Sequence, residues 1–185
     1  ELLDCWNVRN VKIIQGDVLK IENGSMAKWL NGYNYKVVAN LPYYIVSPVI
    51  RKFLELPEAR PREMILMVQK EVAQRICAKP PKMSILAVSV QFYAKSEILF
   101  YVSKNSFWPQ PKVDSAIIKI TPEKLQRAGL CKLFFRVVRA GFSQPRKQIV
   151  NNLSKMLKLD KETVKDWLLE SKIEPTQRAE TLSIK

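Results

Sequence analysis

Short apolar runs rich in β-branched residues recur along the first two thirds of the chain, and polar turns separate them. Runs of this kind, bounded by Gly, Pro or Asp, are typical of β-strands. They predict five strands, over residues 11–15, 35–39, 64–68, 98–102 and 116–120.

Helical spacing is found between these strands, over residues 45–56, about 70–78 and 84–94. In the first segment we expect Ser47 to be the N-cap and Pro48 the first helical residue. Residues 84–94 fit a helix or a strand, and their length together with Ser84 favours a helix. Strands alternating with helices predict an α/β fold, with a parallel or mostly parallel sheet and an antiparallel edge at its last two strands.

The pattern changes after Thr121 and Pro122, where helical spacing dominates. One helix is expected to bury a face made of Leu130, Leu133, Phe134, Val137 and Val138. A second amphipathic helix is expected over 160–172, with Asp160 as its N-cap and an inner face of Val164, Trp167 and Leu168. We therefore expect two domains, a sheet domain over 1–121 and a small helical domain over 122–185.

Composition and charge narrow the function. The 185 residues are 47% apolar, enough to form a core, which excludes global disorder. Lysine and arginine number 31 against 17 acidic residues, a net charge of +14 that predicts a polyanionic partner, nucleic acid ahead of membrane. No apolar run approaches the ~20 residues of a membrane span, which argues against an integral membrane protein.

Two residue types restrict the chemistry. The chain has no histidine, which excludes His-based triads and His-ligated metals, and we expect no metal site. The three cysteines, Cys5, Cys77 and Cys131, are far apart and form no CxxC pair. Their odd number argues against a disulfide framework and favours a reducing, cytosolic compartment.

The segment Asn40–Tyr43 follows a predicted strand directly, where ligands bind in open α/β sheets. The Asn40 amide oxygen can accept from an amino group, and Pro42 stiffens the turn that carries the Leu41 carbonyl. Tyr43 offers a flat face to an aromatic base. Together they suit the exocyclic amine of a flipped-out base. The alternative is that Asn and Pro here only form a turn.

A second candidate segment is the Pro-rich stretch 107–115, with the sequence FWPQPKVDS. Its prolines predict an extended loop between strands that presents the aromatic pair Phe107 and Trp108. The alternative is a stiff connector whose two rings fill the core.

Four motifs in this order resemble the small-subunit ribosomal RNA adenine dimethyltransferase family: NLPYY, FWPQPKVDSAI, FSQPRKQIVNNL and RAETLSI. The resemblance covers nearly the whole chain. It implies a Rossmann-like class I methyltransferase sheet followed by a small all-helical, RNA-binding domain. It also implies N6-dimethylation of two adjacent adenines near the 3′ end of small-subunit rRNA, with S-adenosylmethionine as methyl donor. Apart from the resemblance, we expect a monomer in the cytoplasm. Macrolide-resistance 23S rRNA adenine methyltransferases share the first two motifs and are an alternative.

The resemblance also implies residue roles. The side-chain oxygen of Asn40 and the carbonyl of Leu41 would accept from the target amine, next to Pro42, while Tyr43 and Phe107 would sandwich the base. Asp17 and Val18, in a GDVL motif, would bind the cofactor together with Asn40.

The tail adds a candidate RNA-binding surface. Nine basic residues and no acidic one lie between Lys124 and Leu159. Solvated faces normally mix signs, so this run favours contact with the rRNA backbone over the alternative of a solvated helix face. The residues expected to make that contact are Arg136, Arg139, Arg146 and Lys147.

One feature departs from the family. Its Gly-rich cofactor loop and ribose-binding acid have no counterpart here, and the chain holds five glycines in all. We therefore expect a family member without its N-terminal part, which alone binds S-adenosylmethionine poorly. This departure favours, as the competing function, a non-catalytic rRNA-binding or ribosome-assembly module on the same scaffold.

Overall fold

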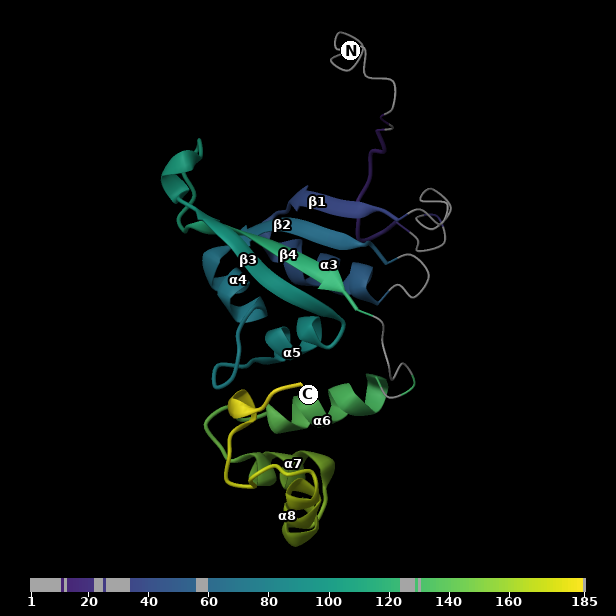
Figure 1. Ribbon diagram of the computed structural model, residues 1–185, viewed down its shortest axis with the longest axis vertical. Coiled ribbons are helices and arrows are strands. Elements are labelled where there is room, and N and C mark those ends of the chain that lie inside the picture. The colour runs from purple at the N-terminus through teal and green to yellow at the C-terminus, as the bar shows by residue number, and fades with distance from the viewer. Residues whose placement is uncertain are drawn as a thin grey trace.

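One sheet organises the first part of the molecule (Figure 1). The computed structural model describes residues 11, 13–21, 25, 34–55, 60–123, 129 and 131–184. Within them the strands are β1 (Lys36–Asn40), β2 (Glu63–Gln69), β3 (Ala94–Val102) and β4 (Ser115–Pro122), in the spatial order β1-β2-β4-β3. β1 and β2 are parallel, and β4 is antiparallel to both β2 and β3.

Helices connect and follow these strands. In the sheet part they are η1 (Tyr43–Ile45), α3 (Val46–Leu54), α4 (Lys70–Ile76), α5 (Ile85–Gln91) and η2 (Lys104–Ser106). After the sheet come α6 (Cys131–Gly141), α7 (Ile149–Leu157), α8 (Lys161–Glu170) and η4 (Ala179–Thr181).

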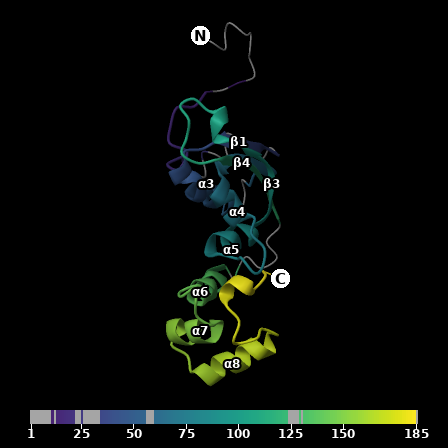
Figure 2. The ribbon, with the colours of Figure 1, turned by 90° about the vertical axis from the view of Figure 1, so that its left-hand side faces the viewer.

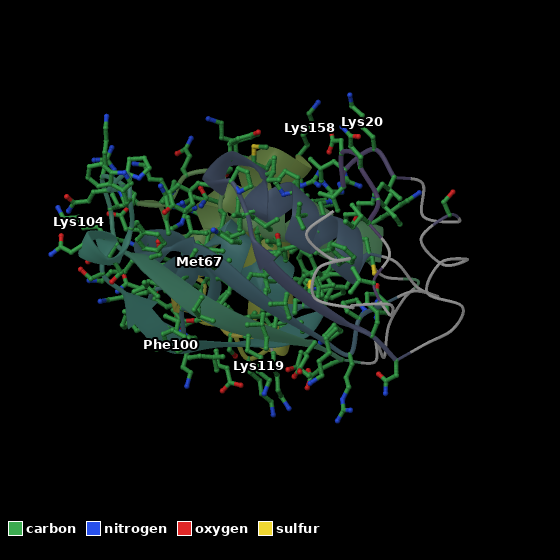
Figure 3. All side chains as sticks on the ribbon, turned by 90° about the horizontal axis from the view of Figure 1, so that it is seen from above. Lys20, Met67, Phe100, Lys104, Lys119 and Lys158 are labelled. Carbon is green, nitrogen blue, oxygen red and sulfur yellow. The ribbon has the colours of Figure 1, made fainter. Side chains whose placement is uncertain are left out.

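The sheet core lies on one face of the strands. β2 alternates fully buried with half-buried residues, and Met64, Leu66 and Val68 form its buried row. Helices α3, α4 and α5 cover that face (Figure 2), where Ile50 and Leu54 of α3 join the same core cluster. The row on the opposite face includes the half-buried Met67, labelled on the sheet in Figure 3. Burying one row of β2 against these helices therefore fixes the register of this strand.

The helical tail packs on α5 through aromatic rings. Phe134 of α6 stacks on Phe92 with ring centroids 4.3 Å apart. A second apolar cluster joins α6, α7 and α8 around Leu153, Val164 and Leu168. None of the described helices is both long and apolar enough to cross a membrane.

Most predicted elements are confirmed. The strands near 35–39, 64–68, 98–102 and 116–120 are present, and β3 begins four residues earlier than expected. Ser84 caps α5 by accepting from the Ala87 amide at 3.2 Å, and the Asp160 carboxylate accepts from two amides at the start of α8. The antiparallel edge is confirmed, but parallel pairing among the described strands is limited to β1 and β2.

Two local predictions at the N-terminal side are wrong. The described residues of 11–15 form no strand, and Val11, Ile13 and Ile14 are exposed, because none of them pairs with a neighbouring strand. Ser47 is not an N-cap, because η1 already turns the chain into the helix and α3 begins before it, at Val46. Pro48 is therefore the third residue of α3, not the first.

In helices α6 and α8 of the tail, fewer of the predicted apolar residues are buried than expected. Leu133 is 57% exposed, because α6 packs on α5 through Phe134 and Val138 instead. Val164 and Leu168 are buried as expected, whereas Trp167 is 42% exposed, beside the stripe they form on α8. Leu130 lies outside the described residues.

Candidate active site

The strand ends gather at one edge of the sheet. Asn40 ends β1 and lies opposite Met67, two residues before the end of β2. Ser115, the first residue of β4, pairs with the last residue of both β2 and β3, Gln69 and Val102. The loop 103–114 therefore leaves and re-enters the sheet at the same edge as Asn40. In Figure 1 both the head of the β1 arrow and this loop lie on the left.

The turn after β1 holds its residues in different environments. Asn40 is exposed, whereas Leu41 is half-buried and packs against the sheet core. Pro42 has φ −54° and ψ 133°, and its carbonyl accepts from the Ile45 amide at 3.1 Å to close η1. The turn thus presents a side-chain amide next to the Leu41 carbonyl, and Pro42 fixes the backbone there and adds no N–H donor of its own.

A hydrogen bond to the first residue of β4 fixes the side chain of Tyr43. Its hydroxyl lies 3.1 Å from the Oγ of Ser115, which is fully buried. This hydrogen bond joins residues 72 positions apart and ties the turn to the base of the loop 103–114. Because the hydroxyl is held, the ring has a fixed direction, and Tyr43 is 36% exposed to solvent.

A hydrogen bond and an ion pair hold the base of the loop that carries Phe107. The Asp114 carboxylate accepts from the Lys104 amide at 3.1 Å and lies 3.5 Å from the Nζ of Lys70. The hydrogen bond from the Lys104 amide lowers the pKa of Asp114, and attraction to Lys70 acts in the same direction. Asp114 is therefore a carboxylate at neutral pH that holds the loop, not a proton donor. Phe107 follows η2 and is half-buried.

Asp17 and Val18 belong to a separate turn, residues 17–21. The Asp17 carboxylate accepts from the Leu19 amide at 2.9 Å, and Val18 packs against the sheet core. Lys52, in the last turn of α3, donates its ammonium to the carbonyls of Leu19 and Ile21 and so ties this turn to α3. In Figure 3, Lys20 of this turn lies far from Lys104 of the loop 103–114.

Lys52 gives this turn a testable anchor. Lys52→Met should leave two carbonyls without their charged donor, and hydrogen bonds to charged groups contribute about 1.5–3 kcal/mol. We expect amide exchange at Lys20 and Ile21 to become roughly tenfold faster or more. Arg51→Met is the matched control, since Arg51 pairs with Glu55 on α3 and, among the described residues, makes no hydrogen bond or ion pair to the turn 17–21. If the amide exchange rates at Lys20 and Ile21 are unchanged in Lys52→Met, Lys52 does not stabilise this turn.

A basic cleft separates the sheet from the helical tail. It has a volume of about 480 Å³ and lies between α3, α6 and α7. Its charged lining is Arg51, Glu55, Lys132, Arg136 and Arg139. Burial raises the pKa of Tyr93, also in the lining, to about 12, so this phenol stays neutral. Four cations against one carboxylate make the cleft suited to a polyanion.

Arg146 and Lys147 lie outside this cleft lining, on the exposed loop between α6 and α7. The loop is held by Asn152, which is 3% exposed. Its Nδ2 donates to the carbonyls of Gly141 at 2.7 Å and Gln144 at 3.0 Å. Both amide hydrogens are thus used to fix where α6 ends and the basic loop begins.

Asn152 is therefore expected to matter for stability. Asn152→Asp keeps the shape but removes both donors, leaving buried carbonyls and a buried acid, and we expect a loss of about 1–3 kcal/mol in the free energy of unfolding. Asn151→Asp is the matched control, since Asn151 makes only one long, exposed contact, of 3.4 Å, to Gln148. Urea denaturation of both variants measures the difference. Equal losses would show that added charge, not the buried amide, is responsible.

Sequence reasoning missed several of these residues. Ser115 and Asp114 were inside the FWPQPKVDSAI motif, but their partners, Tyr43 and Lys104, could be identified only in the fold. Arg51 and Lys132 join the cleft only because α3 and α6 face each other there. The described residues contain no group of three or more His, Cys, Asp or Glu that could hold a metal ion.

Comparison with known proteins gives the family. Residues 5–185 match the family described as ribosomal RNA adenine dimethylase. A ribosomal RNA small subunit methyltransferase A from Dehalococcoides mccartyi is 43% identical over 179 residues, which cover 95% of this chain and 60% of that protein. The protein of the same name from Caldanaerobacter subterraneus subsp. tengcongensis is 45% identical over 181 residues, 95% of this chain and 66% of that one. The chain thus spans about 60 to 66% of the length of these relatives.

Solved structures agree in fold. A dimethyladenosine transferase from Plasmodium falciparum superposes with a TM-score of 0.78 at 23% identity, over 98% of this chain and 71% of that one. The 23S rRNA methyltransferase ErmE gives 0.71 at 21% identity, over 97% and 70%. The sheet with its helices is therefore the Rossmann-like fold of these methyltransferases, and the chain belongs to the ribosomal RNA adenine dimethylase family.

Proposed function

We propose that this protein dimethylates N6 of two adjacent adenines near the 3′ end of small-subunit rRNA, with S-adenosylmethionine as methyl donor. The observation that carries the proposal is the edge formed by the exposed Asn40, the Leu41 carbonyl before Pro42, and Tyr43 locked to Ser115. The names of the relatives, small subunit methyltransferases, support the choice of RNA.

The reacting amine is weakly nucleophilic because its lone pair is delocalised into the adenine ring. The Asn40 side-chain oxygen and the Leu41 carbonyl would accept its two N–H bonds and turn the lone pair toward the open side. Tyr43 and Phe107 would hold the ring between them, and such stacking contributes about 1–3 kcal/mol per base. The contribution of the chain is therefore orientation, which needs no general base.

S-adenosylmethionine would supply the electrophilic methyl group when bound. The residues expected to hold it are Asn40, at this edge, and Asp17 and Val18, in the turn that Lys52 ties to α3. The chemistry proposed here for the chain's own residues is limited to holding the adenine.

The RNA backbone would lie along the helical tail, residues 122–185, as a separate RNA-binding domain. Arg136 and Arg139 would contact phosphates inside the basic cleft, and Arg146 and Lys147 would contact them from the loop that Asn152 holds. The partner would be the small-subunit rRNA or its precursor particle, bound by a monomer in the cytoplasm.

The test uses the protein with its native flanking sequence. It is incubated with S-adenosylmethionine and small-subunit rRNA. Part of the RNA is digested to nucleosides, in which mass spectrometry identifies the methylated base, and part to oligonucleotides, in which tandem mass spectrometry locates it. We expect N6,N6-dimethyladenosine at two adjacent positions. RNA binding without methylation would overturn the proposal in favour of a non-catalytic assembly module, and methylation of only 23S rRNA would overturn the proposed substrate.

A further inference from the structure

Trp108 is the most exposed large apolar residue that the structure describes. Its side chain is 97% exposed, although it directly follows the half-buried Phe107. An indole in this position contributes nothing to the core. This contradicts the alternative in which both rings of the loop fill the core. A fully exposed tryptophan offers both faces of a large ring to a ligand.

The loop presents this ring in a defined way. Gln110 donates to the side-chain oxygen of Asn105 at 2.7 Å across the loop. The Asp114 carboxylate closes its base by accepting from the Lys104 amide at 3.1 Å, and the Lys70 amide donates to the Asp114 carbonyl at 3.0 Å. An exposed ring on a loop closed by these contacts needs little further ordering before it binds.

The loop that carries Trp108 is rich in lysine at its base. Lys104 and Lys112 lie on the same loop and, with Lys70, line a cavity of about 370 Å³ at its base. Of the two carboxylates in this lining, Asp114 is already engaged by the loop and Lys70. An exposed ring among lysines matches the combination that proteins use for unpaired nucleic acid, in which aromatic faces stack bases and cations follow the backbone.

We propose that Trp108 stacks on the unpaired base next to the target adenine. This inference rests on the proposed function and extends it by one nucleotide. Extruding an adenine removes a stacking partner from each of its neighbours, and the indole at the same sheet edge replaces one of them. Lys104 and Lys112 lie within the same loop, where the phosphates beside that nucleotide pass. Stacking is tolerant of base identity, so Trp108 adds affinity without selecting a sequence.

The test measures RNA binding, which needs no cofactor. Fluorescein-labelled fragments of small-subunit rRNA are made intact and with a single abasic site at each position flanking the target adenines. Anisotropy titrations compare the natural protein with Trp108→Ala and Trp108→Phe. Trp167→Phe, in α8 of the helical tail, is the matched control for loss of an indole.

We expect Trp108→Ala to weaken binding of the intact RNA by about five- to a hundredfold, whereas Trp108→Phe and Trp167→Phe stay close to the natural protein. An abasic site at one flanking position should abolish the difference between the natural protein and Trp108→Ala. Equal affinities of these two proteins for intact RNA, or a difference that persists with every abasic site, would overturn the inference.

The two proposals fail in distinguishable ways. If methylation occurs and Trp108→Ala binds normally, the inference alone is wrong. If the nucleoside assay finds no methylated adenine, the proposed function fails whatever Trp108 does. Intrinsic fluorescence provides a second readout, since stacking on a base should quench the emission of the natural protein and of Trp167→Phe but not of Trp108→Ala.

Discussion

Asn40→Ala, made in the protein with its native flanking sequence, should lower the single-turnover rate of methyl transfer by about a hundredfold or more, because misplacing a reacting group has an effect of this size. Affinity for rRNA should change by less than about threefold, since Asn40 acts on the amine and phosphates provide most of the affinity. Single-turnover kinetics and a binding titration on the same RNA measure the two quantities.

The control for Asn40→Ala is Asn151→Ala, which removes a surface amide from α7, distant from the sheet edge. It should keep both rate and affinity. A near-natural single-turnover rate in Asn40→Ala would contradict the assignment of Asn40 to the amine, and a large loss of affinity with an unchanged rate would make Asn40 an RNA-binding residue instead.

Replacing Arg136, Arg139, Arg146 and Lys147 with glutamine should weaken binding of small-subunit rRNA by roughly one to two orders of magnitude at low salt. Each ion pair with a phosphate that the substitutions remove should reduce the slope of log affinity against log salt by about 0.7–0.9. Base selectivity should change little, because phosphate contacts position the RNA and base contacts specify it. Titrations at several salt concentrations give the affinity and the slope together.

A matched control removes the same charge elsewhere. Its four substitutions to glutamine are at the exposed residues Lys79, Lys82, Lys161 and Lys165. It lowers the net charge equally but leaves the cleft and the α6–α7 loop intact. If both quadruple variants lose the same affinity and slope, net charge and not the cleft with the α6–α7 loop attracts the RNA, and the search for the RNA path should move to the exposed Arg62 and the sheet part.

The regular elements could be predicted because their signals are local. Alternation along β2, the Ser84 cap and the Asp160 cap can be identified within a few residues of sequence. The segment 11–15 has the composition of a strand, but a strand also needs a hydrogen-bonded neighbour, and composition cannot supply one. Ser47 failed as a cap for a similar reason, since the preceding turn decides where a helix begins.

The candidate site was partly predictable for the same physical reason. The sequence identifies Asn40 at the end of a strand and Phe107 in a loop between strands, and the sheet topology then brings their segments to one edge. The Tyr43–Ser115 contact links residues 72 positions apart, and the cleft residues Arg51 and Arg136 come from separate elements. Such contacts depend on packing between elements and have no local pattern.

The most direct test of the account asks whether the oxygens of Asn40 and Leu41 at the sheet edge recognise the adenine amine. Inosine replaces the two target adenines, which exchanges the N6 amine for a carbonyl that would face the Asn40 and Leu41 oxygens. Binding of adenine and inosine RNA to the natural protein and to Asn40→Ala then forms a double-mutant cycle. The account predicts that inosine weakens binding to the natural protein by roughly fivefold or more and to Asn40→Ala by clearly less. An equal penalty in both proteins, or none in the natural one, would contradict it.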